Sequence, residues 1–86
     1  MARVVMSLRG EQIRAARALI RFEQADLAKA CQLSLDTIKR LERVRGPVEA
    51  NLRTITAILD VFAQHDVFFE IRENGVLSVS YCPQEQ

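Results

Sequence analysis

Four charged side chains near the middle of the chain are spaced to form one row on a helix. The row consists of Asp36, Lys39, Arg40 and Arg43, which stand at positions i, i+3, i+4 and i+7. Arg40 could donate two hydrogen bonds to guanine O6 and N7, Asp36 could accept one from cytosine N4, and Lys39 could reach a base or a phosphate. The row therefore predicts a surface that reads base edges in the major groove of duplex DNA, although a solvated helix face can have the same pattern.

Neighbouring residues extend this candidate surface. Leu35 could touch a thymine methyl group, and Thr37 could contact a base or a phosphate. Gln24 opens the preceding helix, where its amide and the terminal N–H groups could hold a phosphate. The other candidates for phosphate contacts are Ser34, Arg43 and Arg45. The expected site thus combines base-reading side chains with side chains that hold the DNA backbone.

Four helices are predicted to position these side chains, over residues 10 to about 21, 24 to about 31, 35 to about 43, and 52 to about 64. Ser34 and Asn51 are good N-caps for the third and fourth helices, because their side chains can accept hydrogen bonds from free N–H groups. Gly46-Pro47 should end the helical region before the fourth helix. The expected inward-facing residues are Ile13, Ala16, Arg17 and Ile20, then Leu27, Ala28 and Cys31, then Ile38, Leu41 and Glu42, then Leu52, Ile55, Leu59 and Phe62.

The end of the chain alternates between apolar and polar residues over 67–72 and 76–81, which predicts two strands. A three-residue loop with Gly75 in the left-handed conformation pairs residue 72 with residue 76, and this register collects the apolar side chains on one face. A lone hairpin is marginally stable, so it should pack on the helices near Phe62. It either only caps this core or also joins two subunits, and the candidate dimer residues are Phe68, Phe69, Ile71, Val79 and Tyr81.

Two charged residues, Arg17 and Glu42, fall on the inward stripes of their helices. A buried charge without a partner is strongly destabilising. We therefore expect the two side chains to form an ion pair that ties the first helix to the third. The alternative is that each side chain reaches solvent separately.

Composition limits the classes of protein that the chain can represent. With 86 residues, 49% of them hydrophobic and 27% charged, it should form one small globular domain. Its net charge of +1 conceals ten basic against five acidic residues in 1–46 and two against six in 47–86. This asymmetry suggests that only one end meets a polyanion, although ordinary solvated surface can have the same distribution of charge. No apolar run is long enough to span a membrane and no secretory signal is evident, which favours a cytoplasmic location.

Features of enzymes and metal proteins are missing from the sequence. It has one His and two Cys without a CxxC pair, which excludes a Cys/His zinc site and a disulfide framework. We also find no nucleophile–base pair and no glycine-rich phosphate loop. We therefore expect neither catalysis nor a metal or cofactor.

Matches to a known family are spread over four elements in the expected order. They comprise Gly10 to Leu19, Gln24-Ala25-Asp26-Leu27-Ala28, Leu33-Ser34, Thr37-Ile38-Lys39-Arg40-Leu41-Glu42 and Gly46-Pro47-Val48. In these residues the chain resembles the lambda-repressor/Cro-like helix-turn-helix family, also called the XRE family, over about residues 8–65. The resemblance implies a mainly α fold of four to five short helices and a pair between Arg17 and Glu42. It also implies that the DNA-facing residues are Gln24, Leu35, Asp36, Thr37 and Arg40.

The chain departs from the family pattern at three positions. Glu23 stands where Ser or Thr is common, and its charge would repel a phosphate approaching that helix end. Gln32 stands at a turn position usually held by Gly, where a left-handed backbone would cost about 1–2 kcal/mol. Val44 also replaces a common Gly, and because positive φ is unfavourable for a β-branched residue, we expect the chain to leave the third helix differently.

Together these observations predict three segments: a helix-turn-helix DNA-binding domain over 8–65, a β-hairpin over 66–82 and a flexible tail over 83–86. The expected function is sequence-specific binding of double-stranded DNA by a transcriptional regulator, most simply a repressor. A homodimer would place two recognition helices about 34 Å apart on a palindromic operator. The alternative is an antitoxin of a toxin–antitoxin pair, or another protein-interaction module, whose hairpin binds a toxin or other protein.

Overall fold

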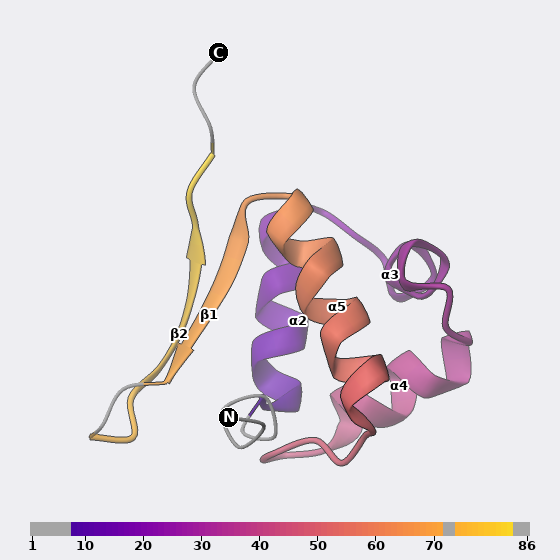
Figure 1. The fold of residues 1–86 in the computed structure, drawn as a ribbon, viewed down its shortest axis with the longest axis horizontal. Coiled ribbons are helices and arrows are strands. Elements are labelled where there is room, and N and C mark those ends of the chain that lie inside the picture. Colours follow the sequence, from indigo (N-terminus) through magenta and orange to yellow (C-terminus); the bar gives the residue numbers. More distant parts are fainter. Residues whose placement is uncertain (1–7, 72–73, 84–86) are drawn as a thin grey trace.

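The structure is a computed structural model that describes residues 8–71 and 74–83. This part of the chain forms four helices followed by one antiparallel hairpin (Figure 1). The elements are α2 (Gly10–Leu19), α3 (Gln24–Cys31), α4 (Leu35–Arg43), α5 (Leu52–Gln64), β1 (Val67–Ile71) and β2 (Leu77–Tyr81). The prediction of a mainly α fold with a C-terminal hairpin is confirmed. Beyond Pro83, the predicted flexible tail lies outside the described residues.

Local signals set the ends of the helices. Ser34 Oγ accepts a hydrogen bond from Thr37 N at 3.0 Å, and Asn51 Oδ1 accepts one from Thr54 N at 2.8 Å, so both predicted N-caps are confirmed. Helix α2 ends at Leu19, earlier than predicted. Arg21 has a φ of 58°, a left-handed conformation that cannot continue a right-handed helix.

The core is mostly aliphatic and receives side chains from all four helices and the first strand. Its largest fully buried residues are Phe62, Ile13, Leu27, Ile38, Leu41, Ile55, Ile58, Val48 and Val67. The predicted inner face of α5 is wrong at Leu52, which is 53% exposed, whereas Leu59 is partly buried against the core. Helix α5 is apolar on more than one face, and it buries Ile58 and Val61 instead.

A close backbone contact joins the start of α2 to the end of α4. A Cβ atom added to Gly10 would lie 2.7 Å from the carbonyl oxygen of Leu41 and closer still to that of Val44. Real Cβ atoms do not approach backbone oxygens this closely. Glycine at position 10 therefore allows the two helices to meet at this point.

The chain leaves α4 in an extended conformation. Val44 has φ −72° and ψ 131°, which agrees with the expectation that a β-branched residue avoids positive φ. Gly46 takes the positive φ of 140° instead. An isolated bridge between Arg9 and Pro47, with Val48 N donating to Leu8 O at 2.8 Å, then fixes this connection against the start of α2.

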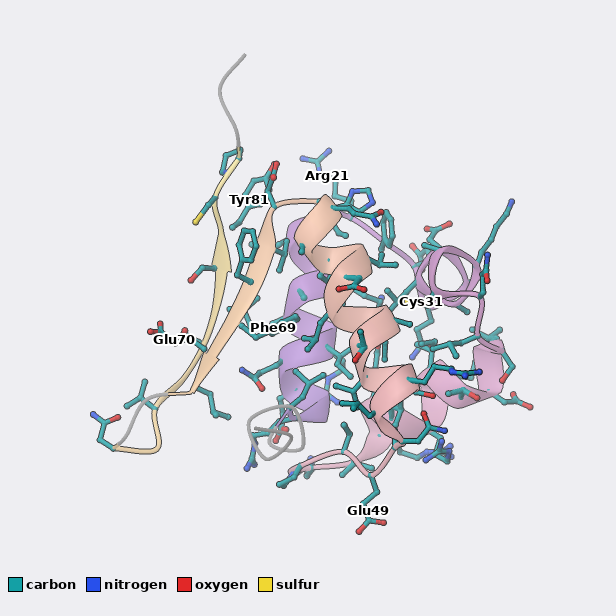
Figure 2. All side chains as sticks on the ribbon, viewed as in Figure 1. Arg21, Cys31, Glu49, Phe69, Glu70 and Tyr81 are labelled. Carbon is teal, nitrogen blue, oxygen red and sulfur yellow. The ribbon has the colours of Figure 1, made fainter. Side chains whose placement is uncertain are left out.

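The hairpin packs on α2 and α5 and has the predicted register. Phe69 pairs with Val79 across the strands, and Gly75 is left-handed with a φ of 84°; residue 72, the predicted partner of Val76, lies outside the described residues. Phe69 points toward the helices (Figure 2), and its ring meets that of Phe62 edge-on at 5.5 Å between centroids. The hairpin is therefore part of the core.

This packing corrects part of the predicted dimer surface. Phe69 and Val79 lie partly buried against the chain's own core, so their side chains are not free for a second subunit. Phe68 and Tyr81 are 45% and 49% exposed. Ile71 pairs with Leu77, and its side chain is outside the described residues.

Buried Gln12 fastens the hairpin to α2. Its Nε2 donates to Ser78 O on β2 at 3.1 Å, and its Oε1 accepts from Arg9 N at 3.0 Å. Both ends of the amide are thus satisfied inside the protein.

None of the helices in the described part of the chain combines the length and apolar character that a membrane span requires.

Candidate nucleic-acid interface

Helix α4 is divided between a buried face and a charged face. Ile38 and Leu41 are fully buried in the core. The opposite face exposes all four members of the predicted row, Asp36, Lys39, Arg40 and Arg43. The structure therefore brings these side chains to one solvent-facing surface, where three cations and one carboxylate are available to a ligand.

An ion pair under this surface connects α4 to α2. Arg17 Nε donates to Glu42 Oε2 at 2.6 Å, and Arg17 Nη2 donates to Glu42 Oε1 at 2.8 Å. The side chains are 18% and 2% exposed, respectively. The predicted pair between Arg17 and Glu42 is therefore present, with the bidentate geometry that gives strong charge-assisted hydrogen bonds.

The arginine of this pair also holds the chain between α2 and α3. Arg17 Nη1 donates to Phe22 O at 2.9 Å, so one guanidinium on α2 contacts both α4 and the connection to α3. The hydrogen bond to Glu42 raises the pKa of Arg17 further above its usual value. Arg17 is therefore charged at physiological pH.

Gln24 joins the same network. Its Nε2 donates to Glu42 Oε1 at 3.1 Å, so the side chain predicted to hold a phosphate is anchored beneath α4. An amide nitrogen carries two N–H groups, and one of them remains for a further acceptor. Gln24 is thus held in place at the N-terminus of α3 while keeping one donor for a ligand.

The turn between α3 and α4 fixes the relative position of the two helices. Gln32 has a φ of 59° and ends α3 in the left-handed conformation, as its position in the sequence predicts. Leu33 N then donates to Ala28 O at 2.9 Å. This arrangement satisfies a carbonyl at the end of α3 and turns the chain into the N-cap of α4.

The start of α4 presents small polar groups and one apolar side chain. The hydroxyls of Ser34 and Thr37 lie 2.8 Å apart and share a hydrogen bond, so neither is held away from solvent by the core. Leu35 is exposed beside them. These three predicted contact residues lie together at the N-terminal end of α4.

The remaining basic candidates flank the other end of α4. Arg40 Nη1 donates a long hydrogen bond to Glu49 O at 3.4 Å. The side chain of Arg40 therefore points toward the extended segment that follows the helix. Arg45 is exposed in that segment. Arg40 can leave this long hydrogen bond at low cost, because the group that it contacts is a solvent-accessible loop carbonyl.

Sequence reasoning missed one basic side chain of this surface, Arg14 of α2. It donates a hydrogen bond to Glu42 O near the end of α4. Arg14 lies with Lys39 and Arg43 around a hollow of ≈ 360 Å³. The sequence signal was available, since Arg14 stands three residues before Arg17 and so on the same side of α2.

His, Cys, Asp and Glu side chains are the groups that could ligate a metal ion. Within residues 8–71 and 74–83, no three His, Cys, Asp or Glu side chains are grouped so that they could hold a metal ion. Burial raises the pKa of the Cys31 thiol to about 11, so this side chain is a neutral thiol at physiological pH. Cys31 thus acts as a small core residue.

Comparisons with known proteins returned no relative for this chain: no family model, no curated protein and no solved structure matches it. The interpretation of the surface therefore depends on its own geometry and chemistry.

Proposed function

We propose that the protein is a DNA-binding transcriptional regulator of the lambda-repressor/Cro-like helix-turn-helix type. Helix α4 would enter the major groove, with Arg40 and Asp36 facing base edges and Lys39 reaching a base or a phosphate. Leu35 and Thr37 would extend these contacts at the start of the helix. The protein would act in the cytoplasm, most simply as a repressor that occupies its operator.

The observation that carries this proposal is the exposed charged row of α4 on a rigidly held helix. A recognition helix must present side chains to bases while its own position is fixed. The Arg17–Glu42 pair and the buried residues Ile38 and Leu41 hold α4 from beneath. The row is left free to meet DNA, because the hairpin packs on α2 and α5 instead (Figure 1).

Two-fold symmetry would complete the site on DNA. Most soluble oligomers are symmetric, and a two-fold dimer reads a palindrome with one helix in each half-site. The hairpin is a two-stranded sheet without a third strand in the described part of the chain, and it exposes the side chains of Phe68 and Tyr81. We therefore place the dimer contact on the hairpin edges rather than on its core-facing residues.

Selection from a random pool of duplex DNA tests this function. Sequencing of the retained DNA should reveal one palindromic site whose half-sites are about one helical turn apart. A pool that remains random after repeated rounds, although the protein is folded by circular dichroism, would reject sequence-specific binding.

The second candidate is an antitoxin, or another module that binds a protein. Phe68, Tyr81 and Leu19 are exposed apolar side chains away from α4, and such side chains are enriched where proteins meet. On this alternative, DNA binding is secondary and the hairpin region holds the toxin. Stable co-purification with the product of a neighbouring gene, together with loss of that complex in Phe68→Lys, would favour the alternative.

A further inference from the structure

We propose that the hollow between α2 and α4 is a binding site for one phosphate of the DNA backbone. The side chains that bind this phosphate would be Arg14, Lys39 and Arg43. This inference rests on the proposed function and makes it more specific. It adds Arg14 to the interface and assigns Lys39 to the backbone rather than to a base.

The hollow has a basic lining drawn from three helices. Its walls are formed by Arg14 and Arg17 from α2, Gln24 from α3, and Lys39, Glu42 and Arg43 from α4. Its volume of ≈ 360 Å³ is more than a phosphate group requires, so water can share the space. The hollow opens beside the charged row of α4, because Lys39 and Arg43 belong to both surfaces.

The charge of the hollow is unbalanced. Four of its side chains are cationic and one, Glu42, is anionic. Glu42 is already neutralised by the two hydrogen bonds from Arg17. Three positive charges, those of Arg14, Lys39 and Arg43, therefore remain for an incoming anion.

Nearby acidic groups do not cancel this excess. Glu23 is close enough to act electrostatically on Arg17, which is the cation already paired with Glu42. Glu11 is held by Arg9 at 3.5 Å, near the first turn of α2. Asp36 lies one turn before Lys39 on α4, but in residues 8–71 and 74–83 no ion pair joins Arg14, Lys39 or Arg43 to a carboxylate.

Arg14 is oriented before any ligand arrives. Its Nη1 donates to Glu42 O, which leaves the other N–H groups of its planar guanidinium for a second acceptor. A side chain that is already ordered loses less conformational entropy on binding. The carbonyl of α4 thus prepares Arg14 to meet a phosphate oxygen.

The position of the hollow selects a phosphate of duplex DNA as its occupant. A helix in the major groove lies between two phosphate backbones, and basic side chains on its flanks contact them. In the proposed docking, α2 lies beside the backbone that borders α4. Gln24, with its remaining amide N–H, would contact the same or the adjacent phosphate.

The salt dependence of DNA binding tests this assignment. Arg14→Gln, Lys39→Gln and Arg43→Gln should each lower the magnitude of the slope of log K against log salt by about one. At 0.1 M salt, each change should weaken binding to every duplex by about tenfold. Arg21→Gln is the matched control, because Arg21 is an exposed arginine at the far end of α2 (Figure 2); its slope should equal that of the wild type.

Base preference separates the two roles of Lys39. If Lys39 holds a phosphate, Lys39→Gln keeps the ranking of operator variants while lowering all affinities together. A changed preference at one base pair would overturn the assignment of Lys39. Arg43→Gln keeps the test independent of folding, because the Arg43 side chain forms no hydrogen bond or ion pair among the described residues.

Failure of this inference is distinguishable from failure of the proposed function. Wild-type slopes in all three variants, with an operator still bound, would overturn the phosphate site alone. Absence of any complex between the wild-type protein and duplex DNA would reject both.

Discussion

At the residue scale, Arg17 connects the stability of the protein to the position of its candidate recognition helix. Its guanidinium contacts Glu42 of α4 and the carbonyl of Phe22 between α2 and α3. Glu42 is almost fully buried and also accepts a hydrogen bond from Gln24. Loss of Arg17 would leave the buried carboxylate of Glu42 without its cation. Because Glu42 belongs to α4, this loss would destabilise the helix that carries the charged row.

We expect Arg17→Ala to lower the free energy of unfolding by about 3–5 kcal/mol, because Glu42 would be left buried and unpaired. Urea denaturation followed by circular dichroism measures this loss. Arg17→Met combined with Glu42→Leu should be much less destabilising, since it removes both charges and fills the same space. A loss within error for Arg17→Ala would show that the pair does not stabilise the fold.

Arg40 is the residue best placed to give sequence preference. Replacing it by Ala should cost about 1–3 kcal/mol on the specific site and relax the preference at one base pair. Competition binding against a panel of single-base operator variants measures both effects. Arg45→Ala is the comparison, and it should weaken all duplexes alike if Arg45 holds a phosphate. Equal losses on every sequence for Arg40→Ala would contradict its base-reading role.

At the element scale, the junction between α2 and α4 sets the geometry of the site. Gly10 allows the start of α2 to meet the carbonyl oxygens at the end of α4. Arg14 and Arg17 then contact Glu42 within the next two turns of α2. The helix that carries the charged row is therefore positioned from α2 as well as from α3.

Gly10→Ala should destabilise the protein by about 1–3 kcal/mol, although alanine has the better helix propensity, because the added methyl group meets backbone atoms that cannot move freely. Thermal and urea unfolding measure the change. Ala15→Gly at an exposed position of the same helix should cost only about 0.5–1 kcal/mol. A more stable Gly10→Ala protein would mean that the two helices are not in close contact.

The elements differ in how much of them the sequence predicts. Helix α4 was predicted with its bounds because Ser34 caps it and its polar and apolar faces are distinct. The hairpin register followed from the alternation of apolar residues and from Gly75. The inner face of α5 was wrong only at Leu52. Apolar residues surround that helix, and tertiary contacts decide which of them are buried.

The candidate site was predicted only in part for a similar reason. The row on α4 and the Arg17–Glu42 pair follow from helical spacing. The contribution of Arg14 requires knowing that α2 lies beside the end of α4. The partial burial of Phe69 and Val79 likewise depends on how the hairpin meets α2 and α5, which no local pattern specifies.

At the scale of the whole molecule, the proposed function uses two separate surfaces, one for DNA and one for the contact between subunits. The charged row belongs to α4, and the hairpin lies on the other side of α2 and α5 from α4 (Figure 1). A contact between subunits through the hairpin would therefore leave both copies of α4 uncovered. Basic residues concentrate in 1–46 and acidic residues in 47–86, which under the proposed function would favour DNA on the α4 side.

We expect the wild-type protein to be a dimer in solution. The double variant Phe68→Lys, Tyr81→Lys should be a folded monomer, because charges at strand edges oppose edge-to-edge pairing. Sedimentation equilibrium measures the mass of each protein. Leu52→Lys, at an exposed apolar position of α5, should remain a dimer. If the hairpin variant keeps the wild-type mass, the subunits associate through another surface.

The most direct test of the central claim is a titration of a randomised DNA duplex with the purified protein at low ionic strength, followed by fluorescence anisotropy over increasing salt. The account predicts a complex whose affinity falls steeply as salt rises, and a selected palindrome that is bound about 10³-fold or more tightly than unrelated DNA. If no complex forms even at the lowest salt, α4 is not a DNA-reading helix.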